Sequence, residues 1–264
     1  MPPLAAPLRR PVGARRALLG LLAAGAAVGA VPRASAGEVT VAVAANFAGT
    51  LAQLAPGFTA ATGHVLKASA GATGKFYSQI TTGGAPFEVL LSADDETPRR
   101  LVAEGRAVAG SQFTYAIGQL VLWSATAGLV DDQGAVLASG RFNRLAIANP
   151  KTAPYGRAAV EVLQARGLHA AVTPRLVTAE GIARAYQFVA TGNAELGFVA
   201  LSQVAVPGRP LTGSLWRVPP GLHAEIRQDA VLLKAGERNP AAAALLQYLK
   251  SPPARAVITA YGYR

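Results

Sequence analysis

Residues 65–80, VLKASAGATGKFYSQI, predict a strand, a glycine-rich turn and the start of a helix. Val65 and Leu66 begin an apolar run, and Phe76 and Ile80 recur at helical spacing. A helix that starts directly after a strand presents unpaired backbone N–H groups and the positive end of its dipole. This arrangement suits an anion, although an ordinary tight turn fits the same residues.

The segment also matches part of a nucleotide-binding P-loop. Gly74 and Lys75 fit the pattern G-x-x-x-x-G-K-[ST], but Ser69 replaces the first glycine. Phe76 replaces the residue whose hydroxyl reaches Mg²⁺ in a P-loop. These differences argue against a nucleotide and leave another anion as the ligand to consider.

Composition limits the class of protein. The chain has 264 residues, 51% of them hydrophobic, and no cysteine, so we expect a full core without disulfides or thiolate metal sites. The formal net charge is +11, yet beyond residue 36 the basic residues are scattered and no basic stripe is interleaved with aromatics. We therefore expect no nucleic-acid partner, and a mild positive field that favours anionic ligands.

The first 36 residues have the pattern of a secretory signal peptide. Arginine pairs at 9–10 and 15–16 precede an apolar stretch at 17–31, and Ala34-Ser35-Ala36 provides an A-x-A cleavage pattern. Arg15-Arg16-Ala-Leu-Leu also fits a twin-arginine leader, and ordinary secretion fits equally well. We expect cleavage before Gly37 and export to the periplasm.

Strand and helix signals alternate after residue 37. The predicted strands are 39–44, 65–68, 87–91, 120–123, 145–148, 175–177, 196–199, 215–218 and 230–234. The predicted helices begin near 47 and 76 and cover 94–104, 156–165, 182–190, 240–249 and 254–260. This alternation predicts an α/β fold with mainly parallel sheets flanked by helices, and the number of strands favours two lobes.

Three predicted strand-to-helix turns are alike. They contain Asn46, Thr73 and Tyr155, each at a helix start beyond the carboxyl end of a strand. Ligands of open α/β sheets bind at this edge, although each turn alone is explained by capping. The acidic run 94–96 also opens a helix, where caps are the ordinary explanation and a catalytic carboxylate pair the alternative.

Over the length of 39–263, the chain resembles the periplasmic molybdate-binding proteins of ABC importers. The resemblance rests on stretches in a fixed order: 41–47, VAVAANF; 71–80, GATGKFYSQI; 84–94, GAPFEVLLSAD; 149–156; 185–189, AYQFV; 197–203, GFVALSQ; 226–231, IRQDAV; and 248–251, YLKS. The resemblance implies a two-lobed class II periplasmic-binding-protein fold with a ligand cleft between the lobes. Lobe 1 would be 37–117 plus 220–264, and lobe 2 would be 118–219.

The family's oxyanion site, carried over residue by residue, implies five ligand-binding residues: Ala45, Asn46, Thr73, Tyr155 and Ile182. Tyr155 and Ile182 would act through their backbone N–H groups. Where some members add a tyrosine, this chain has Ala200. The only metal would be molybdenum or tungsten inside the bound oxyanion, with no cofactor.

The expected protein is therefore a monomeric solute-binding protein that passes molybdate or tungstate to an ABC permease. Neutral donors would hold the dianion, with Lys75 as a rival cationic contact. Another oxyanion such as sulfate remains an alternative ligand. A secreted enzyme is the alternative from another class, but His64, His169 and His223 have no metal-ligand spacing and no G-x-S-x-G motif is present. We expect no catalytic residues.

Overall fold

The computed structural model describes residues 36–264. The expected signal peptide lies outside the described residues, apart from its last residue. Within the described part of the chain, no helix combines the length and apolar character needed to cross a bilayer.

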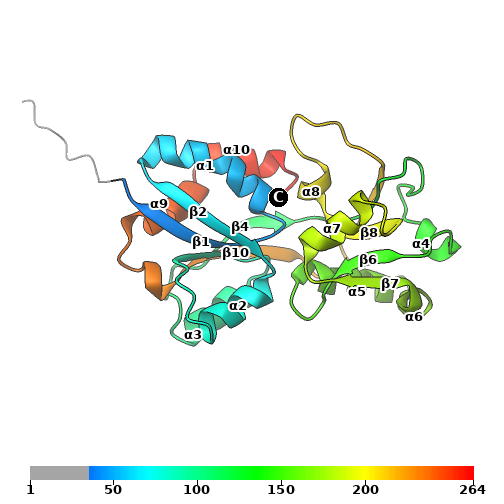
Figure 1. Cartoon of the computed structure of the whole chain (residues 1–264), viewed down its shortest axis with the longest axis horizontal. Coiled ribbons are helices and arrows are strands. Elements are labelled where there is room, and N and C mark those ends of the chain that lie inside the picture. Colours follow the sequence, from blue (N-terminus) through cyan, green and yellow to red (C-terminus); the bar gives the residue numbers. More distant parts are fainter. Residues whose placement is uncertain (1–35) are drawn as a thin grey trace, which may run out of the picture. The chain divides into compact units, whose positions relative to one another are not determined.

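The first of two five-stranded sheets has the order β2-β1-β3-β10-β4. Its strands are β1 (Glu38–Ala44), β2 (Val65–Gly71), β3 (Val89–Leu91), β4 (Phe113–Gly118) and β10 (Ile226–Leu232). Three helices cover one face: α1 (Ala48–Thr62), α9 (Pro240–Leu249) and α10 (Pro252–Ala260). The other face packs against α2 (Thr73–Thr81) and α3 (Glu96–Ala103) (Figure 1).

The second sheet has the order β7-β6-β8-β5-β9. Its strands are β5 (Leu120–Ser124), β6 (Leu145–Ala148), β7 (Leu176–Ala179), β8 (Leu196–Ala200) and β9 (Ser214–Arg217). One face packs against α4 (Val136–Ser139), α5 (Pro154–Ala165) and α6 (His169–Val172). The opposite face packs against α7 (Ile182–Ala190) and α8 (Leu201–Val204).

Strand β1 shows why both faces must be covered. Val39, Val41 and Val43 point to the cluster formed with α1, α9 and α10, whereas Ala42 belongs to the cluster formed with α2 and α3. All four are fully buried, as expected of a central strand whose side chains alternate between two covered faces.

The two-sheet α/β architecture agrees with the predicted fold class, but the sheets are mixed rather than mainly parallel. β1 pairs in parallel with β2 and β3, whereas β10 pairs antiparallel with β3 and β4. The second sheet has the same balance: β6 is parallel to β7 and β8, and β5 is antiparallel to β8 and β9. The antiparallel strands flank the two points where the chain passes between sheets, after Gly118 and again between Arg217 and Ile226.

The short helices α4, α6 and α8 were not expected, and two strands also differ from the sequence-based expectation. β4 was not expected, because residues 113–118 mix aromatic, polar and glycine residues without a clear period. β10 begins at Ile226, four residues before the expected start, because Arg227, Gln228 and Asp229 interrupt the apolar pattern. Gln228 and Asp229 are nevertheless buried. Both amide atoms of Gln228 have partners, and Asp229 Oδ2 accepts from Gln112, whereas Asp229 Oδ1 has no partner among the described residues.

Gly156 is required where α5 starts against the end of β6. A Cβ atom at this position would lie 2.3 Å from the carbonyl oxygen of Ala148, which is backbone and cannot swing away. We expect Gly156→Ala to lower the free energy of unfolding by about 1–3 kcal/mol through overpacking. Urea denaturation measures this. Gly49→Ala is the matched control, because nothing lies within 4 Å of its Cβ and alanine favours helix α1. Equal stability of the two variants would contradict the explanation.

Candidate oxyanion site

The first turn joins β1 to α1 and contains Ala45 and Asn46. The N–H of Ala45 donates to the carbonyl of Gly71 at 2.9 Å, so this predicted site residue has no free backbone donor. Asn46 is 3% exposed. Among the described residues, its backbone N–H has no hydrogen-bond acceptor. Asn46 therefore retains a main-chain donor that Ala45 lacks.

The second turn places Thr73 at the first position of α2. Its hydroxyl oxygen accepts the N–H of Ala93 at 3.0 Å, and the side chain is buried. That bond occupies a lone pair and leaves the hydroxyl hydrogen available to donate. The backbone N–H of Thr73 lies in the first turn of a helix, where no intrahelical acceptor exists. Thr73 can thus supply two neutral donors.

The third and fourth turns open α5 and α7. Tyr155 follows Pro154 at the start of α5, and Ile182 follows the extended Gly181 at the start of α7. Both residues are buried, and within residues 36–264 neither backbone N–H has a hydrogen-bond acceptor. Proline suits this place because it has no N–H of its own to leave unpaired.

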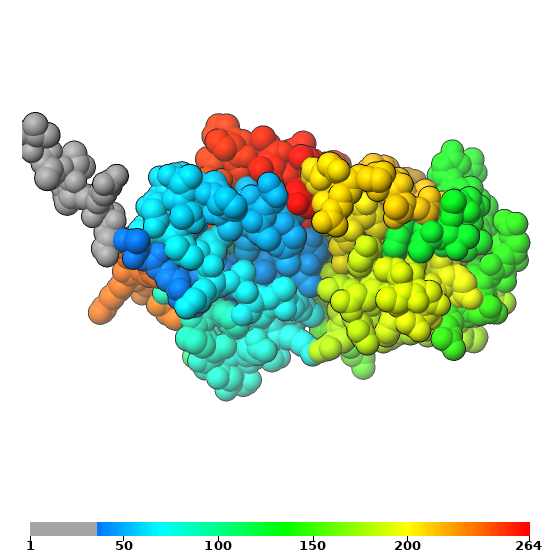
Figure 2. Space-filling model, turned by 45° about the horizontal axis from the view of Figure 1, so that its top comes forward, coloured from blue at the N-terminus to red at the C-terminus, as the bar shows by residue number. Residues whose placement is uncertain are grey.

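Contacts across the boundary between the sheets bring the turns together. The N–H of Gly74 donates to the carbonyl of Thr152 at 3.0 Å, which joins the second turn to the third. A Cβ at Gly181 would lie 3.7 Å from the Cβ of Ala72, so the second and fourth turns are adjacent. Ser202 Oγ donates to the carbonyl of Asn46 at 3.0 Å. Figure 2 shows the blue-to-cyan and red atoms around the first sheet in contact with the yellow and green atoms around the second sheet.

Behind the first and third turns lies a buried polar network that the sequence did not reveal. Its other members besides Asn46 and Tyr155 are Tyr115, Ser202, Gln228 and Tyr263. Burial raises the pKa of Tyr263 to about 12, and it raises the pKa values of Tyr115 and Tyr155 well above the usual range. All three phenols therefore stay protonated at neutral pH. A polar residue within an apolar strand, Gln228 in β10, was the one available signal.

The network occupies the side-chain amide of Asn46. Its Nδ2 donates to Gln228 Oε1 at 2.9 Å and to Tyr263 Oη at 3.1 Å, which uses both amide hydrogens. The expected side-chain donor is therefore directed into the protein in this arrangement. The backbone N–H is the donor that Asn46 has free.

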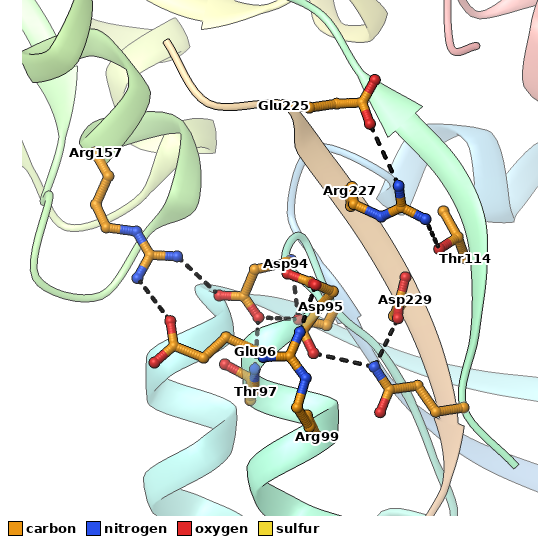
Figure 3. A network of polar contacts seen from close by, with 12 residues as sticks. Asp94, Asp95, Glu96, Thr97, Arg99, Thr114, Arg157, Glu225, Arg227 and Asp229 are labelled. Atoms are coloured by element: carbon orange, nitrogen blue, oxygen red, sulfur yellow. Dashed lines mark hydrogen bonds and ion pairs between the residues drawn. The ribbon is translucent and has the colours of Figure 1, made fainter. Parts of the chain in front are cut away.

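Charged side chains stand at the edges of the site and are paired with one another. Lys75 forms an ion pair with Glu180, beside a groove of about 280 Å³ that Ala45, Ala72 and Gly181 also line. On another side, Arg157 Nη2 lies 3.2 Å from Asp94 Oδ2, and its Nη1 lies 3.5 Å from Glu96 (Figure 3). The four buried candidates themselves are neutral residues, although Lys151 lies in the third turn and Glu180 in the fourth.

The remaining candidates have structural roles in the described residues. Asp94 Oδ1 accepts the N–H of Thr97 at 2.9 Å, so it caps α3 as expected of an acidic helix start. His64 is buried, and its Nδ1 accepts the N–H of Gly37 at 2.9 Å. Ala200 is buried at the end of β8, and its N–H donates to Gln203 Oε1.

The raised pKa of Tyr263 predicts a loss of stability in alkali. Because the folded pKa of about 12 exceeds the ordinary value of 10.0, its stabilising contribution is complete below pH 10 and disappears as the pH rises toward 12. The loss amounts to up to about 3 kcal/mol. We expect the free energy of unfolding, from urea titrations between pH 9.5 and 12, to fall less steeply in Tyr263→Phe. Parallel curves for variant and wild type would contradict this.

Comparisons with known proteins identify the family of this chain. Residues 39–264 match the family model described as bacterial extracellular solute-binding protein. The chain is 60% identical over 230 residues to the molybdate-binding protein ModA of Azotobacter vinelandii, covering 87% of this chain and 91% of that protein. It is 53% identical over 230 residues to ModA of Rhodobacter capsulatus, covering 87% and 89%.

Solved structures show the same relationship. The periplasmic molybdate-binding protein of Azotobacter vinelandii superimposes with a TM-score of 0.83 and 44% identity, covering 86% of this chain and 98% of that one. The sulfate-binding protein SubI of Mycobacterium tuberculosis, at 15% identity and a TM-score of 0.67 with 86% of each chain covered, shares the fold alone. Because this family binds solutes rather than transforming them, the secreted-enzyme alternative is wrong. The chain belongs to the bacterial extracellular solute-binding proteins and, within them, to the family of the ModA proteins.

Proposed function

We propose that this protein captures molybdate or tungstate among the four turns and delivers it to the membrane permease of an ABC importer. The observation that carries the proposal is the set of backbone N–H groups at Asn46, Thr73, Tyr155 and Ile182, all on buried residues, that have no acceptor among residues 36–264. The Thr73 hydroxyl adds a further neutral donor. The names of the relatives, molybdate-binding proteins at 60% and 53% identity, support the same ligand.

Hydrogen bonds to a charged partner contribute roughly 1.5–3 kcal/mol each, so several such donors can offset the dehydration of a small dianion. The three helices that begin at Thr73, Pro154 and Ile182 add the positive ends of their dipoles. A cationic side chain is not required, because Lys75 and Arg157 are already paired with carboxylates.

A site made of donors also selects among oxyanions. Molybdate and tungstate carry no proton at neutral pH and only accept hydrogen bonds. Hydrogen phosphate must place its own O–H, and a buried donor without an acceptor costs about 1–3 kcal/mol. Sulfate has no proton either, so cavity size has to reject it, and the shared fold of a sulfate-binding protein makes it the second candidate.

Transport would follow from closure of two lobes. We propose that residues 37–117 plus 220–264 form one lobe and 118–219 the other, hinged where the chain passes between sheets. The bound anion would hold the lobes together, and the closed monomer would dock on the permease. Export would rely on residues 1–36 and place the protein in the periplasm.

Thermal unfolding with molybdate, tungstate, sulfate and phosphate, each added separately, tests the ligand. An anion at about 100 times its Kd stabilises the fold by roughly 2.7 kcal/mol, which corresponds to a rise in Tm of about 5–10 °C for a chain of this size. We expect a rise with molybdate and tungstate alone. A rise with sulfate, or with none of the four, would contradict the proposed ligand.

The Thr73 hydroxyl gives a sharper test of the neutral-donor site. Thr73→Val keeps the shape of the side chain but removes the hydroxyl, and we expect molybdate binding to weaken by about 1.5–3 kcal/mol in isothermal titration calorimetry. Thr73→Ser should stay close to wild type because the hydroxyl is kept.

Lys75→Ala is the charge control for this experiment. We expect a change of at most about 1 kcal/mol, because the lysine is about half exposed and its partner is Glu180. A larger loss in Lys75→Ala than in Thr73→Val would show that a cation, rather than neutral donors, holds the anion.

A further inference from the structure

Gln228 is a fully buried glutamine that joins two of the four turns. Its Oε1 accepts Asn46 Nδ2 at 2.9 Å and the hydroxyl of Tyr115 at 3.1 Å. Its Nε2 donates to the hydroxyl of Tyr155 at 3.0 Å. The residue lies on β10 beside an irregularity, where the register against β4 shifts between Gln228 and Asp229. One amide therefore connects the first turn, which follows a strand of the first sheet, to the third turn, which follows a strand of the second sheet.

In this arrangement two buried polar atoms are left over. Asn46 Oδ1 has no donor within the described residues, although it is inaccessible to solvent. The hydroxyl of Tyr155 accepts from Gln228, but no acceptor for its own hydrogen lies among residues 36–264. Buried groups without partners are unfavourable, so the network has an unused acceptor and an unused donor.

A joint half-turn of the two amides gives Asn46 Oδ1 a donor and the Tyr155 hydroxyl an acceptor without moving any other heavy atom, and it leaves the Nδ2 hydrogens of Asn46 to be paired. Nitrogen and oxygen of a terminal amide have nearly the same size and exchange places when it rotates. Gln228 Nε2 then donates to Asn46 Oδ1, and Gln228 Oε1 accepts the hydroxyl of Tyr155. Tyr115 still donates to the carbonyl of Ser92, which lies 2.9 Å away, and Ser202 still donates to the carbonyl of Asn46. Every hydroxyl then donates once.

The same rotation puts the Nδ2 hydrogens of Asn46 where its unpartnered oxygen was. These hydrogens then need an acceptor, and the oxyanion that the neighbouring backbone N–H of Asn46 is proposed to hold would supply it. We propose that Gln228 is a positioning residue that sets the hydrogen-bond direction of Asn46, turning the Asn46 amide into a donor when the oxyanion binds. This inference rests on the proposed oxyanion site.

The direction set by Gln228 also bears on selectivity. When Gln228 accepts from Asn46, the asparagine presents an acceptor, which suits an oxyanion that carries a proton. When Gln228 donates, Asn46 presents a donor, which suits a fully deprotonated oxyanion. Because Gln228 also contacts the hydroxyl of Tyr155, the two turns respond to the same ligand together.

Gln228→Met tests the donor, since methionine has a similar length and no amide. We expect its Kd for molybdate, measured by calorimetry, to rise at least about tenfold, because Asn46 loses the group that directs it. Gln112→Met is the matched control: Gln112 is a partly buried glutamine directly before β4 that bonds to Asp229 and to none of the network hydroxyls. Its Kd should stay within about twofold of wild type.

The pH dependence of molybdate binding to Gln228→Glu distinguishes an effect of hydrogen-bond direction from an effect of packing. An ionised carboxylate can only accept, so it holds Asn46 in the acceptor-presenting arrangement, and we expect weak binding at pH 8.5. A protonated carboxyl has one donor and one acceptor, as the rotated glutamine has. Binding should therefore recover as the pH falls to 5.5 and become tighter than that of Gln228→Met, while wild type stays flat.

Each named result either supports or overturns the proposed role of Gln228. Wild-type affinity in Gln228→Met, or no recovery of Gln228→Glu in acid beyond the affinity of Gln228→Met, overturns the role of Gln228 and leaves the oxyanion site standing. A wild-type protein that binds none of the oxyanions overturns the proposed function and this inference together. Thermal unfolding of the unliganded variants confirms that each one is folded before binding is measured.

Discussion

A buried dianion has to be met by hydrogen-bond donors that are already fixed in place, and the proposed oxyanion site of this protein depends on that constraint. Helix starts provide such donors, because the N–H groups of a first turn have no acceptor in their own helix. Here Thr73, Tyr155 and Ile182 occupy the starts of three helices, and Asn46 lies in a tight turn ahead of a fourth. The helices start at this one place because the parallel strands β1, β2, β6 and β7 direct the chain there.

Charged side chains at the edge of the proposed site pair with one another, so the site does not need them to contact the ligand. Lys75 and Arg157 lie close to the second and third turns, and each has a carboxylate partner across the boundary between the sheets. An exposed ion pair of this kind contributes little to stability. Because these charges are paired with each other, the proposed donors to the anion are all neutral. A site with donors only favours an anion that carries no proton.

The polar network behind the turns holds the Asn46 side chain in place and, in our proposal, sets which way its amide donates. Tyr115, Gln228 and Tyr263 hold Asn46 from the interior, and Gln228 also reaches Tyr155. Such a network is stable only when its donors and acceptors match, because the interior offers no water to make up a missing partner. The two amides are the members that can exchange donor for acceptor, so the ligand can decide which arrangement is complete.

The sequence alone determined the α/β class, most of the helices and strands, and the turns at Asn46, Thr73 and Tyr155. These are local properties: apolar periodicity, glycine and small residues at turns, and a helix start after a strand. The resemblance carried by ordered stretches such as VAVAANF and GATGKFYSQI added the family, which the comparisons confirm.

Tertiary structure decided the rest. The start of β10 was missed because Gln228 and Asp229 look exposed in sequence, and their partners Tyr115 and Gln112 are more than 100 residues away in the chain. The N–H of Ala45 donates to the carbonyl of Gly71 and is therefore not free. The side-chain amide of Asn46 donates to Gln228 and Tyr263, which are 182 and 217 residues away in the chain. Local sequence fixes where donors can arise, but which donors stay free depends on acceptors that only the folded chain brings within reach.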